Sequence, residues 1–371
     1  MIMLRLCAIV MLTIWIGMAS AAWAKPVEFV REYSYVAGEA DSKLSCRIIA
    51  LEQVKRLLLE ELGTYLISNT IVSDSRLTKD EIVTYTAGVV VTVILEERWD
   101  GQTYFLKAKI KADADDVAKS IAFIRHDQEK TSELEKLRKQ ANESLREIER
   151  LKQQLALVQQ PSAQQTTTEG NSRAIRHSYE KAIRELSARE FLEQGVAYRN
   201  NHQYEQSITA FKHAGQLAPD WARPHLGRGA ALLRLKQYKR AREAFAQARA
   251  VEPDNAVALS LHGVSLFMTG QKEAGAKEIE QAFEKVSEDP VVLVNRGWLH
   301  LMKHESARSV ELFTKVLLLQ EMKNPRAFYF RGLAYRQLGE RDRAKHDLEQ
   351  AAQLGEPDAA DTLQQLQRSG R

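Results

Sequence analysis

Five glycines recur at a nearly constant interval in the second half of this 371-residue chain. The intervals are 34, 34, 34 and 35 residues, and the glycines are Gly195, Gly229, Gly263, Gly297 and Gly332. A unit of this length holds two helices and a turn, and such units bury their apolar faces only by stacking on one another. The interval therefore predicts a helical solenoid over residues 174–371, in a chain that is mainly α.

Each unit also carries small, aromatic and helix-ending residues at fixed places. In the first unit these are Gly195, Tyr198, Tyr204, Ser207, Phe211, Ala214 and Pro219. In the second they are Gly229, Leu232, Tyr238, Ala241, Phe245, Ala248 and Pro253. This pattern resembles the tetratricopeptide repeat family. The resemblance implies a right-handed solenoid of five repeats starting near residues 188, 222, 256, 290 and 325, followed by a capping helix after Pro357.

The same resemblance implies a concave groove. In the family, positions 2, 5, 9, 12 and 13 of each unit point into it. In repeats two to five these places include Leu226, Ala230, Leu233, Val264, Phe267, Met268, Val294, Trp298, Leu301, Met302 and Tyr329, which form an apolar trough. We expect this trough to bind a peptide or helix of a partner protein, with Trp298 as the anchor whose truncation to alanine weakens binding by at least about 2 kcal/mol. The alternative is that the chain itself, or a second protomer, fills the groove.

Two histidines four residues apart, His300 and His304, first suggest a metal site on one helix face. The repeat phase argues against this. His300 takes the place held by Tyr198 and Leu232 in sister repeats, so it packs between helices, and His304 falls at the turn. We therefore predict no metal and no cofactor.

The N-terminus has the features of an export signal. Arg5 is followed by an apolar run, and Ala22-Trp23-Ala24 forms a cleavage site of small residues. Residues 1–24 are predicted to be a signal peptide cleaved after Ala24, which makes the protein periplasmic or secreted; an uncleaved anchor is the alternative. Cys46 is then the lone cysteine of the mature chain and is predicted to be a buried apolar residue.

Residues 25–125 are predicted to form a small α/β domain. The segment 27–37 is strand-like, and apolar residues at helical spacing follow Asp41. A short helix is expected over 78–87, then two strands joined by the hairpin signal Asp100-Gly101, and a last helix from about Asp113.

Residues 126–158 carry the three-and-four spacing of a coiled coil. The seam consists of Leu134, Leu137, Ala141, Ser144, Ile148, Leu151, Leu155 and Val158. It predicts a homo-oligomer, with a single solvated helix as the alternative. Residues 159–173 lose apolar side chains and are predicted to be a flexible linker.

Enzyme motifs of the hydrolase, nucleotide-binding, zinc-protease and dithiol types are absent from the sequence, so no catalytic residue is predicted. The acidic run at 112–116 is interpreted as a helix start.

The second repeat is strongly basic, and we interpret its charges as a solvated face; a site for an acidic partner, anionic lipid or cell-wall polymer is the alternative. These residues are Arg223, Arg228, Arg234, Lys236, Lys239, Arg240 and Arg242.

The order of signal, coiled coil, linker and repeats resembles the periplasmic repeat protein associated with the Tol-Pal envelope system. The α/β domain departs from that architecture and is faintly similar to N-terminal domains of flagellar assembly protein T. We expect an exported, periplasmic interaction scaffold that is not an enzyme, binds a protein or peptide and no nucleic acid, and has a possible peripheral envelope association. A structural subunit of a secretion or polysaccharide-export assembly and an enzyme with its site in the α/β domain are the alternatives.

Overall fold

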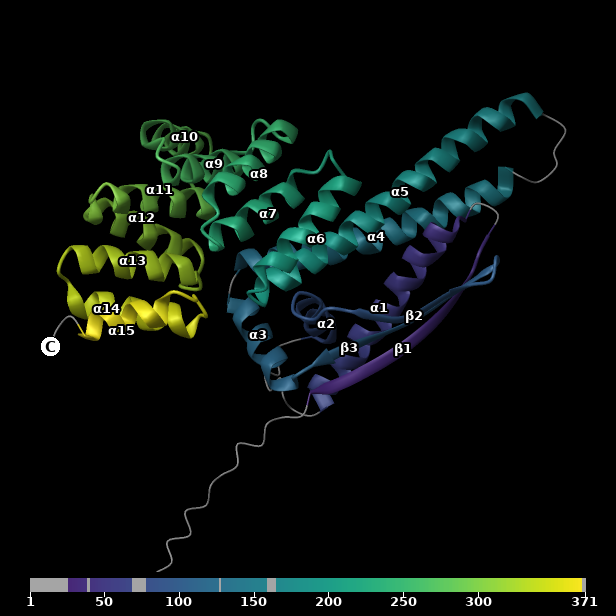
Figure 1. Ribbon diagram of the computed structural model, residues 1–371, viewed down its shortest axis with the longest axis horizontal. Helices are drawn as coiled ribbons and strands as arrows, with labels where there is room; N and C mark the ends of the chain where they lie inside the picture. Colours follow the sequence, from purple (N-terminus) through teal and green to yellow (C-terminus); the bar gives the residue numbers. More distant parts are fainter. Residues whose placement is uncertain (1–25, 39–40, 69–77, 127, 159–164, 369–371) are drawn as a thin grey trace, which may run out of the picture.

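The computed structural model describes residues 26–38, 41–68, 78–126, 128–158 and 165–368 (Figure 1). The predicted signal peptide and its cleavage site lie outside these residues. Figure 1 shows a small sheet with its helices, a long helical hairpin beside it, and an arc of helices that leads away from the hairpin. In the described part of the chain, no helix is long and apolar enough to cross a membrane.

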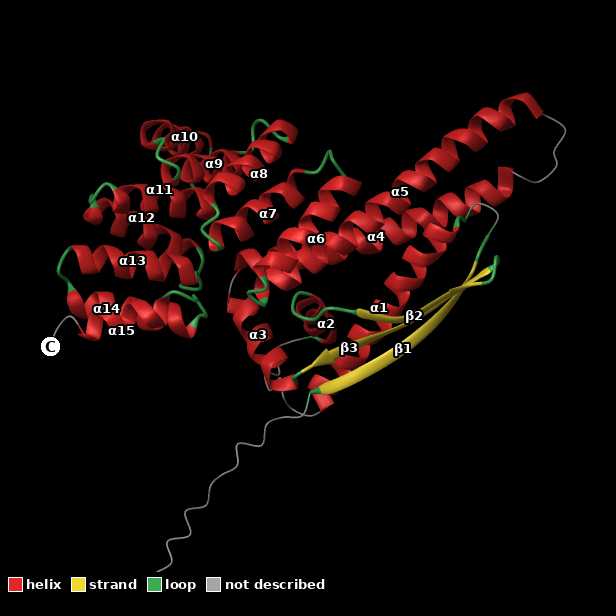
Figure 2. Ribbon diagram, in the orientation of Figure 1, coloured by secondary structure: helices red, strands yellow, loops and turns green. Residues whose placement is uncertain are grey.

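The N-terminal part has the predicted order of elements. They are β1 (Val27–Val36), α1 (Lys43–Ser68), α2 (Lys79–Ala87), β2 (Val93–Trp99), β3 (Thr103–Ala112) and α3 (Ala114–His126). In the residues that the structure describes, the three strands form one antiparallel sheet in the order β1-β3-β2 (Figure 2). The hairpin between β2 and β3 turns at Gly101, whose φ of 102° favours glycine, and the Asp100 side chain accepts hydrogen bonds from the backbone N–H groups of Gln102 and Thr103.

One face of this sheet is apolar and is covered by α1. Alternate residues of β3, from Tyr104 to Ala112, are buried on that face, as the period of two in a strand requires. Cys46 of α1 is fully buried in the same core, as predicted. The opposite face is solvated, and there Lys109 pairs with Glu28 across the strands. The sheet therefore has one packing face, and α1 occupies it.

Helices α4 (Gln128–Val158) and α5 (Gln165–Asn200) form an antiparallel hairpin. The seam residues of α4 from Leu134 to Leu155 are buried, but they face helices of the same chain. Ile148, Leu151 and Leu155 cluster with Tyr179 and with other residues of α5 and α1. The structure thus corrects the predicted occupant of the seam, because α5 and α1 cover the surface that was expected to bind a second protomer. The predicted linker is also helical from Gln165 onward.

Polar contacts fix the hairpin to the α/β part. The Asp41 carboxylate, just before α1, accepts hydrogen bonds from Tyr35 of β1 at 2.9 Å and from Tyr179 of α5. The Lys152 ammonium of α4 lies 3.3 Å from the same carboxylate. Four elements therefore meet at one buried acidic group.

The last turns of α5 are also the first helix of the solenoid. The helices that follow are α6 (Tyr204–Leu217), α7 (Ala222–Arg234), α8 (Tyr238–Val251), α9 (Ala256–Met268), α10 (Lys272–Lys285), α11 (Pro290–Met302), α12 (Ser306–Leu319), α13 (Pro325–Gln337), α14 (Arg341–Gln353) and α15 (Ala359–Arg368). The first helices of the repeats predicted from 222, 256, 290 and 325 begin at those residues, and α15 lies where the capping helix was expected.

The recurring glycines let the two helices of a unit approach each other. A Cβ atom on Gly229 would lie 2.4 Å from the Phe245 ring, and one on Gly297 would lie 2.8 Å from the Phe313 ring. The turn between the paired helices needs a left-handed residue, which His304 supplies at a φ of 60° and Gly270 at 94°. The period of the sequence is therefore a period of close helix contacts and left-handed turns.

A buried charged cluster joins α1 to α5. Lys55 is 7% exposed, and its ammonium lies 2.8 Å from the Glu190 carboxylate and also contacts Glu193. Glu52, one turn before Lys55, adds a third carboxylate. Burial, together with the charges of Glu193 and Glu190, raises the pKa of Glu52 to about 8 although Lys55 opposes the shift. The surroundings of Glu52 therefore favour its neutral form in the folded protein.

This raised pKa predicts a pH-dependent stability. The folded state holds a proton on Glu52 that the unfolded chain releases above its ordinary pKa, so this contribution is fully present below about pH 4.5 and is lost as pH rises toward 8. Glu52→Gln keeps the neutral form at every pH. We expect it to raise the thermal midpoint by about 2–4 °C at about pH 8.5 and to change it little at about pH 4.5, as about 1 kcal/mol would do.

The matched control is Glu60→Gln, which removes a carboxylate of the same helix from an exposed pair with Arg56. Its effect on the midpoint should be small and alike at both pH values. An equal shift for Glu52→Gln at both pH values would contradict the raised pKa of this carboxyl.

Candidate functional site

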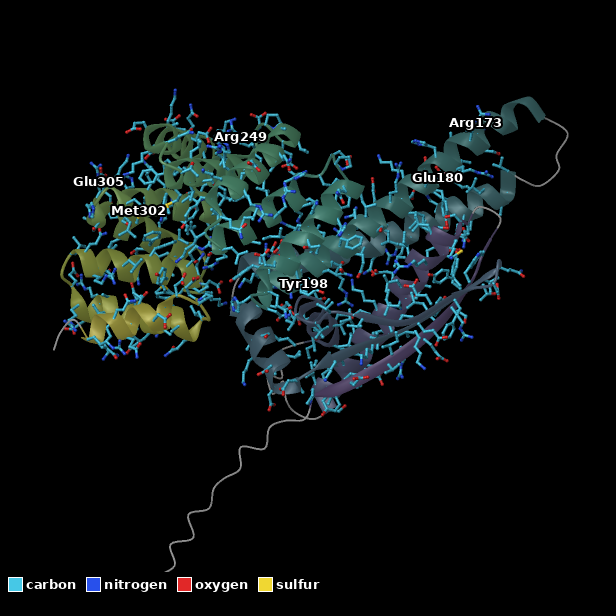
Figure 3. All side chains as sticks on the ribbon, viewed as in Figure 1. Arg173, Glu180, Tyr198, Arg249, Met302 and Glu305 are labelled. Atoms are coloured by element: carbon cyan, nitrogen blue, oxygen red, sulfur yellow. The ribbon has the colours of Figure 1, made fainter. Side chains whose placement is uncertain are left out.

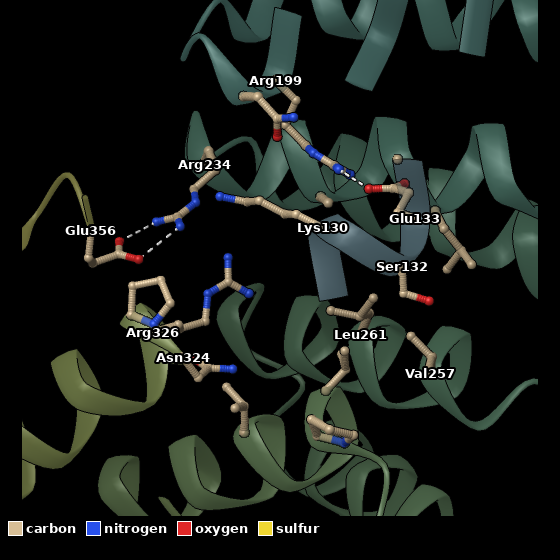
Figure 4. Close-up of a pocket in the computed structure, with 18 of the residues that line it drawn as sticks. Lys130, Ser132, Glu133, Arg199, Arg234, Val257, Leu261, Asn324, Arg326 and Glu356 are labelled. Carbon is tan, nitrogen blue, oxygen red and sulfur yellow. Dashed lines mark hydrogen bonds and ion pairs between the residues drawn. The ribbon is translucent and has the colours of Figure 1, made fainter. Parts of the chain in front are cut away.

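A cavity of about 430 Å³ lies on the inner side of the solenoid. Its wall comes from the start of α4, the α5–α6 turn, helices α7 and α9, the first turns of α11 and α13, and the loop before α15. Figure 4 shows side chains from these elements around one space. Segments as far apart in the sequence as Lys130 and Pro357 therefore build a single site.

The apolar part of the wall comes from three first helices of the repeats. Leu226 and Ala230 of α7, Val257 and Leu261 of α9, and Val294 of α11 all line the cavity. The two residues on α7, like the two on α9, lie four apart, so each pair shares the inner face of its helix. The cavity therefore offers apolar contact on the solenoid side.

The rest of the wall is strongly basic. Among the described residues that line the cavity, two are carboxylates, Glu133 and Glu356. Six are lysines or arginines: Lys130, Lys136, Arg199, Arg223, Arg234 and Arg326. The described lining thus has four more positive than negative side chains.

The two carboxylates are both held by arginines of the same wall. Arg199 pairs with Glu133 across the α5–α4 contact. Arg234, at the end of α7, binds both carboxylate oxygens of Glu356, at 2.6 and 3.1 Å, although the two residues are 122 positions apart (Figure 4). Such two-point pairs are among the stronger polar contacts in proteins. This one connects the second repeat to the loop before the capping helix.

The pKa of Glu356 shows that the electrostatic potential in this region is positive. The residue is only 5% exposed, and burial by itself would raise its pKa. The hydrogen bond from Arg234 and the charges of Arg234, Arg326 and Lys130 outweigh that effect and hold the pKa of Glu356 below its ordinary value. In Figure 4 the nitrogens of those three basic side chains point toward the same part of the cavity. The site therefore favours a carboxylate even where water is excluded.

Helix α4 closes one side of the groove. Its residues Lys130, Ser132, Glu133 and Lys136 line the cavity, and Arg223 of α7 donates to the Glu133 backbone carbonyl at 3.3 Å. The chain's own hairpin thus covers part of the concave surface, which the sequence left open as an alternative.

Three of the eleven predicted groove residues line this cavity: Leu226, Ala230 and Val294. The other eight lie elsewhere on the solenoid, and partner contact at these positions stays a prediction. They are Leu233, Val264, Phe267, Met268, Trp298, Leu301, Met302 and Tyr329. In the view of Figure 3, Met302 lies near the outer edge of the solenoid, close to Glu305.

The Trp298 side chain packs against side chains of neighbouring helices. Its side chain is 9% exposed and packs with Ile279 and Leu299, and the Phe267 ring meets it edge-on with centroids 5.3 Å apart. Neighbouring helices therefore cover most of the indole within this chain, and a role for Trp298 as the anchor of a bound partner stays a prediction.

The two histidines lie where the repeat phase placed them. His300 is 7% exposed, and its Nδ1 atom lies 2.7 Å from the Glu305 carboxylate. His304 occupies the left-handed turn. Within the described residues there is no group of three or more His, Cys, Asp or Glu side chains placed to hold a metal ion.

The basic lining was within reach of the sequence but was missed. Arg223 and Arg326 stand at position 2 of their repeats, one of the places expected to face the groove, where only apolar residues were selected. Glu356 lies between the last repeat and the capping helix, so no repeat position indicated it. Two of the seven basic residues interpreted as a solvated face, Arg223 and Arg234, line the cavity instead.

Comparison with known proteins supports the repeat fold. The family model described as tetratricopeptide repeat matches residues 325–356. No curated protein matches the chain.

Among solved structures, the Cut9-Hcn1 hetero-tetramer of APC/C is 16% identical, with a TM-score of 0.42, 49% of this chain covered and 36% of that chain. A thermophilic TPR protein of Thermus thermophilus is 17% identical, with a TM-score of 0.42 and coverage of 48% and 98%. YrrB, a TPR protein with an unusual peptide-binding site, is 20% identical, with a TM-score of 0.30 and coverage of 50% and 97%. This chain thus spans about a third of the Cut9-Hcn1 chain's length and nearly all of the other two.

The burial of Trp298 predicts an effect on stability. Trp298→Ala removes an indole from a packed contact between repeats, so we expect the free energy of unfolding to fall by about 3–5 kcal/mol. Urea denaturation of a protein that comprises residues 25–371 measures this change. The matched control is Met302→Ala on the same helix, where the side chain is 38% exposed and the loss should be about 1 kcal/mol or less. A fully stable Trp298→Ala protein that had lost its partner would instead support the anchor prediction.

Proposed function

We propose that this protein is an exported, periplasmic scaffold that binds a segment of a partner protein in the cavity on the inner side of its solenoid. The observation that carries the proposal is the cavity itself. Its volume of about 430 Å³, its apolar contacts on one side and its polar groups on the other are the properties of a recognition site. A repeat solenoid offers such an inner surface to extended or helical ligands.

The repeat family supports a binding role over catalysis. Tetratricopeptide repeats are generally non-enzymatic interaction modules, and the family match at residues 325–356 brings this chain into that class of fold. The sequence of residues 1–24 supports export, and on that ground we place the protein in the periplasm.

The seam of α4 is already covered within a single chain. Leu137, Leu151 and Leu155 are each less than 5% exposed within a single chain. A homo-oligomer through this seam would require α4 to separate from α5. We therefore propose a partner of different sequence, bound through the cavity.

Blocking the cavity tests this function. Ala230→Trp places an indole in the space between α7 and α9, so the partner should no longer be recovered when the tagged protein is cross-linked and purified from the native envelope. Recovery should fall at least about tenfold, because steric exclusion leaves no room for the segment.

The matched control is Ala274→Trp, which makes the same change at an exposed position of α10 outside the cavity. It should recover the partner as the unaltered protein does. Equal recovery with Ala230→Trp, in protein whose circular dichroism is unchanged, would contradict the cavity as the binding site. Recovery only within a stable membrane complex would favour the structural-subunit alternative.

A further inference from the structure

We propose that the segment bound in this cavity is acidic and amphipathic, with carboxylates that pair with Arg223 and Arg326 and apolar side chains that contact Val257 and Leu261. The inference rests on the proposed function, since it names the chemistry of the partner at the same site. Three observations in the cavity carry it.

The first observation is the charge balance of the wall. The two carboxylates in the described lining are already bound by arginines, yet the lining keeps four more positive than negative side chains. A ligand that enters must lie against this positive field, and placing like charges side by side is unfavourable. The wall therefore disfavours basic segments and attracts acidic ones.

The second observation is that the site already holds a carboxylate. Glu356, on the loop before α15, is almost fully buried and is bound at two points by Arg234. This intrachain contact shows the geometry in which the wall receives an acidic side chain. Arg326 lines the same space, and its guanidinium points toward it in Figure 4.

The third observation separates acidic protein from nucleic acid. Single-stranded nucleic acids bind where aromatic rings stack on the bases. Among the described lining residues, Tyr204 is the lone Phe, Tyr or Trp, and its hydroxyl lies 3.0 Å from the His202 ring. Apolar contacts come instead from valine and leucine, which suit aliphatic side chains. The cavity therefore suits a segment that combines acidic and aliphatic residues.

Fluorescence anisotropy with defined probes tests the proposal on the full mature chain. The probe is a short fluorescein-labelled peptide in which glutamate alternates with leucine. We expect saturable binding that weakens as ionic strength rises, because the charges are screened. The same peptide with glutamine in place of glutamate should bind at least about tenfold more weakly, as the loss of charge-assisted hydrogen bonds requires.

Substitutions of the cavity arginines test whether the peptide binds in the cavity. Arg326→Gln and Arg223→Gln should each weaken the acidic peptide about tenfold, whereas Arg326→Lys keeps the charge and should retain most of the affinity. The matched control is Lys345→Gln on the surface of α14, which pairs only with an exposed glutamate at 3.8 Å among the contacts described. It should leave the affinity unchanged.

Several outcomes would overturn the proposal: no binding of the acidic peptide at low salt, equal binding of the glutamine peptide, or no effect of the cavity arginines. Equally tight binding of a short oligothymidylate, with the same response to Arg326→Gln, would replace it with a general polyanion site. Its failure is distinct from that of the proposed function. If Ala230→Trp abolishes recovery of the native partner while Arg326→Gln does not, the cavity is the binding site but its ligand is not acidic.

Discussion

The packing of α4 on α5 sets the arrangement of the whole protein. Helix α5 runs without a break from the hairpin into the first repeat, so the direction of the hairpin fixes the direction in which the solenoid begins. Each leucine or isoleucine buried along the seam contributes about 1.5–3 kcal/mol, which together holds the two helices side by side. The contacts of Lys55 and Asp41 then hold the α/β part against the same pair.

The cavity follows from this arrangement. Because α5 leads into the first repeat beside α4, the start of α4 lies against the inner side of α7 and becomes one wall. The opposite side is closed where Glu356 meets Arg234. A regular solenoid has an open groove, but here the hairpin and the last loop add walls to part of that groove and make it basic. Its chemistry therefore depends on residues outside the repeats as well as inside them.

The repeat part was predictable because its signals are local. Gly229 and Gly297 mark close helix contacts, and the residue at each turn has a left-handed backbone. Residues at the same position of successive repeats therefore occupy equivalent places in the solenoid. The strand and helix order of residues 27–125 followed from periods of two and 3.6 for the same reason. The occupant of the α4 seam was not predictable, since an apolar stripe reveals that it is buried but not by which helix. For Trp298, the repeat phase indicated a helix face, but the packing of neighbouring helices decides whether that face is open.

The most direct test of this account is a photo-cross-linking measurement inside intact cells. A photoreactive phenylalanine analogue placed at Val257, within the cavity, should capture one partner protein, and mass spectrometry should locate the cross-link in a segment rich in Asp and Glu. The same analogue at Ala274, on the exposed face of α10, should capture none of it. A cross-link from Val257 only to this chain's own residues, or to a segment without acidic side chains, would contradict the central claim.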